Sequence, residues 1–304
     1  MRIAAVIALA LVLALGGVAA VLASRIDAVA MPQLIAEDEP QRANSDETVY
    51  LFVGADSGIE RAPTDVQSST PEGQARADAL VLVRLGADGT ASAVTLPRDL
   101  LSTNGYFGSM ALALLDGPEV LMQSVCSTTG VAVDRYVSID GAGFVDAIDA
   151  LGGIEVDIEY PLRDAAAELT VDTAGTQQVD GATALGLVRS RHAEQFVDGA
   201  WVAVSEDAGA RQRALWSARV LDGVRSALSD ADAASLASAV WSSSASLSLG
   251  GGLHPFELGR LARAELDIRE LPAEKIGDGR ALKMTEQSTS ALLEAGFRTD
   301  CALE

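Results

Sequence analysis

The chain begins with an apolar run of 21 residues, Ile3 to Ala23, which constrains where the rest of the chain can fold. As a helix this run would be about 30 Å long, the thickness of the hydrocarbon core of a bilayer. Arg2 precedes it and acidic residues follow it, which favours an N-terminus in the cytoplasm. We therefore expect a single-pass cell-membrane protein, with residues 1–24 as a transmembrane anchor, 25–46 as a juxtamembrane linker and 47–304 as an extracytoplasmic domain. The alternative is a cleaved signal peptide, with Ala28-Val29-Ala30 as the cleavage site.

The charge balance excludes several classes of protein. The chain has 22 basic and 43 acidic residues, a net charge of −21, and its only lysines are Lys275 and Lys283. Nonspecific binding of nucleic acid needs cationic groups to neutralise phosphates, so we expect no nucleic-acid partner. A P-loop is excluded because no Gly-x-x-x-x-Gly-Lys-Ser/Thr occurs. Any binding of phosphate must therefore use arginine, backbone N–H groups or a metal ion.

Two cysteines, Cys126 and Cys301, lie far apart in the sequence. In an oxidising compartment they could form a disulfide that ties the C-terminal tail to the domain. The other interpretation is two separate buried thiols, and the sequence alone leaves both open.

Short apolar runs alternate with helical patterns along the exported part of the chain, with no internal repeat. This pattern predicts one α/β domain in which helices cover a central sheet. Glycine and proline mark several boundaries, such as Gly117-Pro118 between two helices and Gly152-Gly153 after a third. Strands are expected at 49–53, 79–85, 91–96, 136–139, 154–158 and 267–271, and helices at 110–115, 118–125, 144–151, 180–189 and 208–228.

Charged residues gather where the predicted strands and one helix end. Loops at strand ends are where a sheet presents polar groups to a ligand. Arginine offers forked donors to phosphate oxygens, whereas a carboxylate next to a phosphate implies a divalent cation such as Mg²⁺ between them. The alternative is a set of surface ion pairs. The residues concerned are Asp56, Arg76, Asp78, Arg98, Asp99, Arg189 and Arg191.

An ordered set of motifs resembles the LytR–CpsA–Psr (LCP) family of cell-envelope phosphotransferases. Each motif is short, but together they run in family order from about residue 48 to residue 228. The matching segments are Val53-Gly54-Ala55-Asp56, Arg76-Ala77-Asp78-Ala79-Leu80, Leu96-Pro97-Arg98-Asp99, Val133-Asp134-Arg135-Tyr136-Val137, Gly143-Phe144, Asp149 to Val156, Val179 to Leu185, Val188-Arg189-Ser190-Arg191 and Arg211-Gln212.

The resemblance implies a fold and a reaction. The fold would be a three-layer α-β-α sandwich with a mixed, largely antiparallel central sheet and an apolar tunnel for a lipid tail. The reaction would transfer a glycopolymer, with one phosphate, from a polyprenyl-pyrophosphate carrier to a hydroxyl of peptidoglycan. By resemblance, Asp56 and Asp78 would bind Mg²⁺, Arg76, Arg98, Arg189 and Arg191 would grip the pyrophosphate, Asp99 would orient an arginine or the metal shell, and Arg211 and Gln212 would lie near the substrate.

The chain also departs from the family pattern. The family usually has Lys-x-Asn-x-Ala-Tyr after the Pro-Arg-Asp segment, whereas this chain keeps Asn104 and Tyr106 without the lysine. If Arg211-Gln212 is the family's Arg-Gln step, an earlier arginine is replaced by Ala208 and an aspartate by Ser205. The alternative function is therefore a non-catalytic envelope regulator or scaffold that binds polyprenyl (pyro)phosphate. The excess of arginine over lysine is typical of a high-GC genome, such as that of an actinobacterium.

Overall fold

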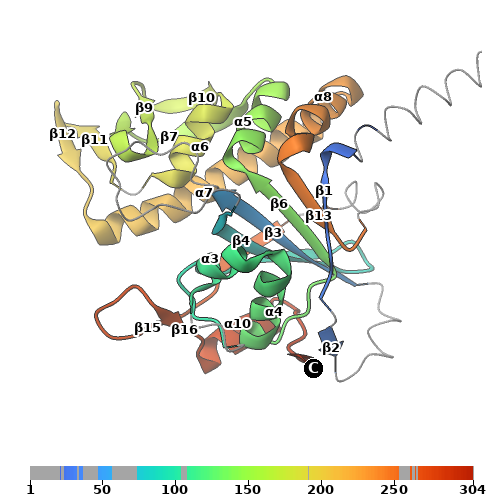
Figure 1. Cartoon of the computed structure of the whole chain (residues 1–304). Coiled ribbons are helices and arrows are strands. Elements are labelled where there is room, and N and C mark those ends of the chain that lie inside the picture. The colour runs from blue at the N-terminus through green and yellow to red at the C-terminus, as the bar shows by residue number, and fades with distance from the viewer. Residues whose placement is uncertain are drawn as a thin grey trace, which may run out of the picture.

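A computed structural model describes residues 21, 24–32, 34–36, 47–56, 74–103, 108–190, 192–252, 261, 264 and 266–303. Its centre is a seven-stranded sheet with the strand order β1-β13-β6-β3-β4-β5-β14 (Figure 1). These strands are β1 (Asp27–Val29), β13 (Leu247–Gly250), β6 (Arg135–Asp140), β3 (Thr48–Asp56), β4 (Arg76–Leu85), β5 (Ala91–Thr95) and β14 (Leu266–Glu270).

The sheet is evenly mixed, which corrects the expectation of a largely antiparallel one. In the described part of the chain, β1 with β13, β3 with β6, and β5 with β14 are parallel pairs. The pairs β13 with β6, β3 with β4, and β4 with β5 are antiparallel. The connections between strands explain this mixture. Within this sheet only β4 and β5 are joined by a short turn, and longer connections bring the other strands in from either direction.

The sheet is apolar on both faces because its strands are apolar at successive positions. In β3, Val49, Leu51 and Val53 point into one core, while Tyr50 and Phe52 belong to a cluster on the opposite face. Alternation of this kind follows from the two-residue period of a strand. Side chains on both faces of β3 are therefore buried or half-buried, and its charged residue, Asp56, lies at the end of the strand.

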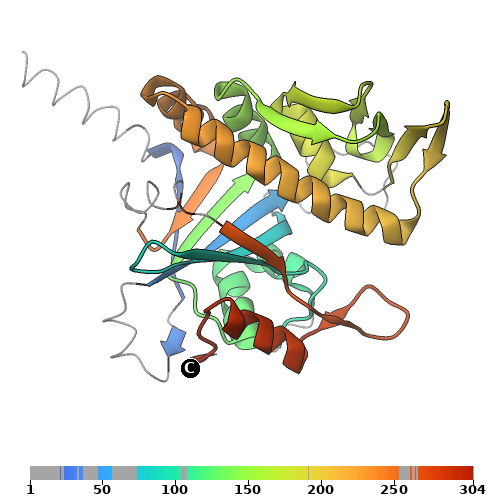
Figure 2. The ribbon, with the colours of Figure 1, turned by 180° about the vertical axis from the view of Figure 1, so that it is seen from behind.

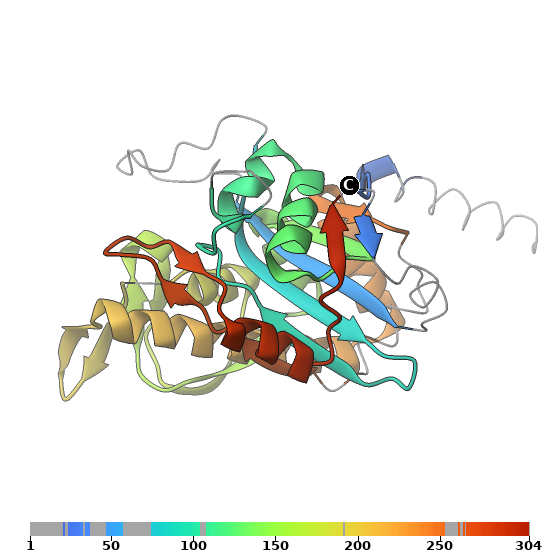
Figure 3. The ribbon, with the colours of Figure 1, turned by 90° about the horizontal axis from the view of Figure 1, so that it is seen from below.

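Three helices and a 3₁₀ turn cover the face that carries Leu51. They are α3 (Met110–Ala113), the turn η1 (Leu114–Asp116), α4 (Pro118–Thr129) and α10 (Glu286–Glu294). Leu121, Met122 and Val125 of α4 are fully buried in the same core as Leu51. The predicted break at Gly117-Pro118 is confirmed, since Gly117 has φ 109° and Pro118 starts α4. Figure 3 shows α4 packed across the strands from this side.

A second group of helices lies beyond the ends of β3 and β6, beside small sheets (Figures 1 and 2). The helices pack with these strands around a separate core that includes Ile148, Ile154, Leu187 and Trp216. The helices are α5 (Gly141–Ala150), α6 (Gly181–Arg189), α7 (Glu206–Asp230) and α8 (Ala233–Ser243), followed by the turn η3 (Ser244–Ser246). The strands are β7 (Ile154–Ile158), β8 (Leu162–Asp164), β9 (Leu169–Val171), β10 (Gly175–Val179), β11 (Glu194–Val197) and β12 (Ala200–Ala203), with the turn η2 (Ala165–Ala167) after β8.

Part of the stretch expected to be a linker is built into the domain. Strand β1 extends the central sheet, and β2 (Leu34–Ala36) pairs antiparallel with β17 (Cys301–Leu303) near the C-terminus. A further small hairpin joins β15 (Glu274–Lys275) to β16 (Leu282–Lys283). The polar composition of residues 25–46 had suggested a spacer, but edge strands gain most of their stability from backbone pairing and need little apolar sequence.

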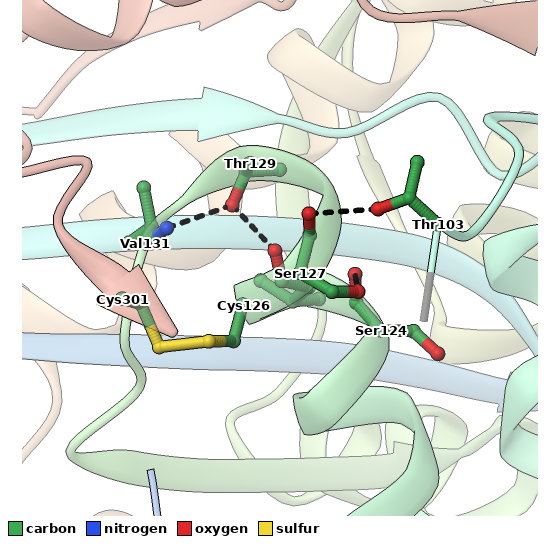
Figure 4. Close-up of a disulfide and its surroundings, with 8 residues drawn as sticks. Thr103, Ser124, Cys126, Ser127, Thr129, Val131 and Cys301 are labelled. Carbon is green, nitrogen blue, oxygen red and sulfur yellow. Dashed lines mark hydrogen bonds between the residues drawn. A yellow bond between two sulfur atoms is a disulfide. The ribbon is translucent and has the colours of Figure 1, made fainter. Parts of the chain in front are cut away.

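A disulfide joins Cys126 on α4 to Cys301 on β17 (Figure 4). The backbone N–H of Cys301 also donates to the carbonyl of Gly130, just after α4, at 2.8 Å. Both cysteines are therefore oxidised, and the interpretation as separate thiols is wrong. The bond fixes the C-terminal strand, and through it β2, to the helical layer.

The expected anchor, residues 1–24, lies outside the described residues apart from Val21 and Ser24. Among the residues that are described, the search for a helix long and apolar enough to cross a bilayer finds none. The anchor thus stays a prediction from the sequence.

Candidate active site

One edge of the central sheet collects most of the charged residues singled out above. Parallel strands β3 and β6 both end at this edge, antiparallel β4 begins there, and β5 ends there. Asp56 at the end of β3 lies directly opposite Arg76 at the start of β4. Residues that are 20 or more positions apart in sequence thereby share one edge because of strand direction alone.

A β-bulge shapes this edge. The register between β3 and β4 shifts between Gly54 and Ala55. A Cβ on Gly54 would lie 3.2 Å from the Cβ of Ala79, so glycine permits the close approach of the two strands. Bulges bend a strand and redirect its side chains, and this one comes just before Asp56.

Arg98 lies between two carboxylates. Its guanidinium Nη1 forms an ion pair and a hydrogen bond with Asp78, and its Nε lies 3.8 Å from Oδ1 of Asp99. The backbone brings these residues together because Leu96 continues the pairing of β5, donating its N–H to the carbonyl of Leu80 at 2.9 Å. The expected role of Asp99 beside an arginine is therefore consistent with its position.

Two guanidinium groups at this edge keep a buried N–H without an acceptor. Within the described residues, the Nε atoms of Arg76, Arg84 and Arg98 are buried and make no hydrogen bond, and Arg76 and Arg98 are the two that lie at this edge. Unpaired buried donors are uncommon in folded proteins, and each asks for an explanation such as a missing ligand. Here the same two side chains are those that the sequence assigns to phosphate binding.

Arg189 approaches the edge from the last turn of α6. Its Nη2 lies 3.8 Å from Oδ1 of Asp56, whose side chain is only 12% exposed. The guanidinium passes over the first residue of α5, because a Cβ on Gly141 would lie 2.8 Å from Nη2 of Arg189. Asp140 caps this helix by accepting from the N–H of Gly143 at 2.8 Å. A side chain at position 141 would therefore force Arg189 to move.

A buried carboxylate that the sequence analysis missed holds the loop after α6. Asp164 is 2% exposed, and its Oδ2 accepts from Ser190 Oγ and from the N–H of His192, both at 2.9 Å. Its Oδ1 accepts from the N–H groups of Ala166 and Ala167. Asp164 thus holds the residues on either side of Arg191, whereas Arg191 itself lies outside the described residues. The local sequence gives little signal, because Asp164 directly follows another charged residue, Arg163, and would ordinarily be expected at the surface.

The remaining predicted residues are placed only in part. Gln212 is half-buried on α7, and Arg211 lies on the same helix with its side chain outside the described set. Asn104 and Tyr106 also lie outside the described residues. The side chain of His192, which follows Arg191, is exposed.

The resemblance implies an apolar tunnel, and the segments that could line it, 110–115, 121–125 and 144–148, contribute to the two cores. Met110, Leu114 and Leu121 belong to the main core, and Phe144 and Ile148 belong to the second one. A wide depression of ≈ 820 Å³ lies elsewhere, over β9, β10 and the start of α6. Its lining includes Asp149, Asp172 and Asp180 and no basic residue, so it is unsuited to an anionic ligand.

The edge combines cations for phosphate with carboxylates that can share a divalent ion. Arg76 on β4, Arg98 in the turn after β5 and Arg189 on α6 provide forked donors. The search for clusters of three or more metal-binding side chains finds none among the described residues. A carboxylate pair alone suits Mg²⁺, which usually binds one or two carboxylates together with substrate phosphates and water.

Comparisons with the sequences of known proteins support the family resemblance described above. The family model described as "LytR_cpsA_psr family" matches residues 18–200. A probable cell wall biosynthesis protein, LcpB of Corynebacterium glutamicum, is 34% identical over 157 residues, covering 50% of this chain and 38% of that protein. The cell wall biosynthesis protein LcpA of the same organism is 28% identical over 187 residues, covering 48% of this chain and 35% of LcpA. The matches thus span well under half the length of these curated relatives.

Solved structures share the fold over most of the chain. A LytR-Csp2A-Psr enzyme from Actinomyces oris superposes with a TM-score of 0.72 and 27% identity, covering 91% of this chain and 98% of that chain. TagV of B. subtilis superposes with a TM-score of 0.58 at 19% identity, covering 83% and 98%. The expected α/β fold with a mixed central sheet is confirmed.

Proposed function

Because the chain belongs to the LytR_cpsA_psr family, we propose that it attaches a glycopolymer to the cell wall. The donor is a glycopolymer on a polyprenyl pyrophosphate, and the acceptor is a hydroxyl of peptidoglycan. The relatives named for cell wall biosynthesis and the superposed enzyme support this assignment. The protein acts at the outer face of the cell membrane, held by residues 1–24.

The observation that carries the proposal is the pair of unsatisfied guanidinium N–H groups on Arg76 and Arg98. Both belong to the sheet edge that also receives Arg189. Oxygens of a pyrophosphate would accept from these donors, which removes the cost of leaving them buried and unpaired. The three arginines together would offset much of the negative charge of a pyrophosphate.

Asp56 and Asp78 are the residues that would hold Mg²⁺ at this edge. Each is paired with an arginine in the structure, Asp56 with Arg189 and Asp78 with Arg98. The donor set fits the ion, because two carboxylates and phosphate oxygens are its common partners. When bound, the ion neutralises charge that develops on the phosphates.

The proposed reaction is a phosphoryl transfer with a simple balance of bonds. The acceptor oxygen attacks the phosphorus that bears the glycopolymer and forms a new P–O bond. The bond from that phosphorus to the bridging oxygen breaks, polyprenyl phosphate leaves, and the hydroxyl proton is released. The chain's own contribution is alignment and charge stabilisation by Arg76, Arg98 and Arg189, which is the main requirement of such reactions.

The test compares two arginines on the same strand. Arg76 lies at the proposed site, whereas Arg84 lies at the other end of β4 and pairs with Glu47 at 2.8 Å. We expect Arg76→Ala to weaken binding of a polyprenyl-pyrophosphate analogue by about 10- to 100-fold, the effect of losing charge-assisted hydrogen bonds. Arg84→Ala should bind like the unmodified chain. Equal affinity of all three proteins would refute the site.

Transfer is measured separately from binding. The full chain is mixed with a lipid-linked pyrophosphate donor and a peptidoglycan oligomer, with and without Mg²⁺, and products are identified by mass. A product that depends on Mg²⁺ supports the transferase. Binding without any product supports the alternative of a non-catalytic binder, which is favoured by the missing lysine before Asn104 and by Ala208 and Ser205.

A further inference from the structure

The exposed face of α8 carries an apolar surface that is unusual for so acidic a chain. Leu236, Val240 and Trp241 are 36%, 48% and 43% exposed. Their spacing of four and five positions puts them on one side of the helix. We refer to these three side chains as the α8 surface, and we propose that it lies on the lipid bilayer.

The sequence around this surface has no charge. From Ala233 to Phe256, 24 consecutive residues include no Asp, Glu, Lys or Arg, in a chain with a net charge of −21. A helix that faces water usually carries charged residues on its outer side. Serine, alanine and a few large apolar residues instead suit the boundary between water and lipid, where tryptophan is enriched.

The position of the apolar N-terminal run supports a lipid bilayer as the partner of the α8 surface. The run Ile3 to Ala23 ends two residues before Arg25, and the Arg25 guanidinium lies 4.8 Å from the ring centre of Trp241. Strand β1 starts at Asp27 and pairs at once with β13, which follows α8 by a single turn. If the run spans the membrane as proposed above, the α8 surface can be only a few residues from the bilayer. This inference rests on that part of the proposed function.

Two acidic residues make hydrogen bonds with α8. Asp232 caps α8 by accepting from the N–H of Ser235 at 2.7 Å, and Asp146 on neighbouring α5 is bonded through its carbonyl to Ser242 Oγ. Arg25 adds one positive charge beside Trp241. With this balance, contact with lipid would depend mainly on apolar burial and little on salt.

The same placement brings the arginine edge towards the membrane. Asp27, Ser248, Ser138 and Val53 form one row across four adjacent strands, so Asp27 is three strand spacings, about 14 Å, from β3. Asp56 lies three residues further along β3, about 10 Å in the strand direction. A pyrophosphate whose lipid tail stays in the bilayer would therefore reach Asp56 and the neighbouring arginines without moving far from the membrane surface.

The experiment uses the full chain in nanodiscs made of phosphatidylcholine and phosphatidylglycerol. Lipids brominated near the headgroup quench the fluorescence of tryptophans that touch the bilayer. The chain has three tryptophans, of which Trp216 is 3% exposed and Trp201 lies on the distant β11–β12 hairpin. We expect quenching in the unmodified chain and in Trp201→Phe, and loss of most of it in Trp241→Phe. The quenching should persist at high salt.

A second variant tests the surface without removing the probe. Leu236→Gln with Val240→Gln should reduce the quenching of Trp241, and should slow transfer from a long-chain donor in the bilayer but not from a water-soluble short-chain analogue. Equal quenching in Trp241→Phe and the unmodified chain overturns the inference. So does an unquenched Trp241, the result expected if the apolar run or a second copy of the chain covers α8.

Extraction at alkaline pH separates this inference from its premise. Protein that stays in the membrane fraction while Trp241 is unquenched refutes the α8 surface and leaves the anchor intact. Protein that is released refutes the anchor and with it the inference. Neither result depends on pyrophosphate binding, which the Arg76 and Arg84 variants test independently, or on phosphotransfer, which the product assay tests.

Discussion

Asp164 shows how one buried carboxylate can organise a site that it does not touch. It accepts four hydrogen bonds, two from the η2 turn and two from the loop after α6. A buried charge is tolerated because every one of these donors compensates for lost water. Its partners Ser190 and His192 flank Arg191, so the aspartate fixes the direction in which this loop leaves α6.

We expect Asp164→Ala to destabilise the domain by about 3 kcal/mol, because buried donors lose their charged acceptor. The variant should also lose pyrophosphate binding under conditions in which it remains folded. Asp172, which is exposed on the nearby loop, provides the control, and Asp172→Ala should leave both properties unchanged. Denaturant unfolding and ligand binding measure the two effects, and normal binding by folded Asp164→Ala would contradict the positioning role.

Tyr136 makes stability sensitive to alkaline pH. Burial raises the pKa of its phenol to about 12, while a hydrogen bond with Ser138 acts in the opposite direction. In the unfolded chain the phenol of Tyr136 ionises near pH 10. The contribution of the neutral phenol to the stability of the folded state is therefore complete below pH 10 and is lost as pH rises through 12.

The unmodified chain should therefore lose up to about 3 kcal/mol more than Tyr136→Phe between pH 10 and 12. The free energy of unfolding as a function of pH measures this difference. Tyr160→Phe should stay closer to the unmodified chain, because Tyr160 is exposed and the pKa of its phenol is raised chiefly by a hydrogen bond with Glu159 rather than by burial. Parallel pH profiles for Tyr136→Phe and the unmodified chain would contradict the assignment.

At the scale of elements, the contact between α5 and α6 sets where Arg189 lies. A Cβ on Gly181 would lie 2.4 Å from the carbonyl oxygen of Val145, so only glycine allows the two helices to come so close. The N–H of Gly181 donates to Asp149 at 2.7 Å, which locks the start of α6 to α5. The arginine at the other end of α6 is thereby aimed at the end of β3.

Gly181→Ala should destabilise the domain by about 2 kcal/mol, the usual cost of overpacking against backbone. The matched control is Gly279→Ala, where the nearest atoms to the added Cβ lie 4.0 Å away. Thermal unfolding of both variants checks the expectation. If the two variants unfold at the same temperature, the close helix contact is not essential.

The sequence predicted most elements, and its misses have physical causes. Apolar runs placed β3, β4, β5, β6 and β7, and Asp180 marks the start of α6 because it caps that helix, accepting from the N–H of Thr183 at 2.8 Å. Strands β8, β9, β11 and β12 are short, and their pairing partners provide more of their stability than their own sequence does. Strand β4 begins three residues early, at Arg76, because backbone pairing with β3 continues past the apolar segment.

The structure brings several of the predicted site residues to one edge, whereas their roles in binding and transfer stay predictions. Charges at strand ends identified Asp56, Arg76, Asp78 and Arg98, because strand direction collects such ends at one edge. Gly141 and Asp164 were missed because their roles depend on the approach of α6, which no local pattern encodes. The Mg²⁺ site, Arg191 and Arg211 stay predictions.

At the scale of the whole molecule, the disulfide closes a long loop. Cys126 and Cys301 are 175 positions apart, and together with β2–β17 pairing they hold the C-terminal strand on α4. A cross-link over such a span restricts the unfolded chain strongly, which raises the relative stability of the folded state.

Reduction should lower the free energy of unfolding by about 2–5 kcal/mol. Cys126→Ala with Cys301→Ala should show the same loss and should no longer respond to reductant. Thermal unfolding with and without dithiothreitol measures both. An unmodified chain whose unfolding temperature is the same in both conditions would contradict a stabilising role for the bond.

The pairing of the first strands with late ones also affects the order of folding. Strand β1 has its partner β13 more than 200 residues later, and β2 pairs with β17, which begins only at Cys301. Such distant contacts form slowly, because the intervening chain must be ordered first. The part of the nascent domain that contains β1 and β2 therefore stays unpaired until these distant strands have been made, and until then it is exposed to proteases and to pairing with a neighbouring chain.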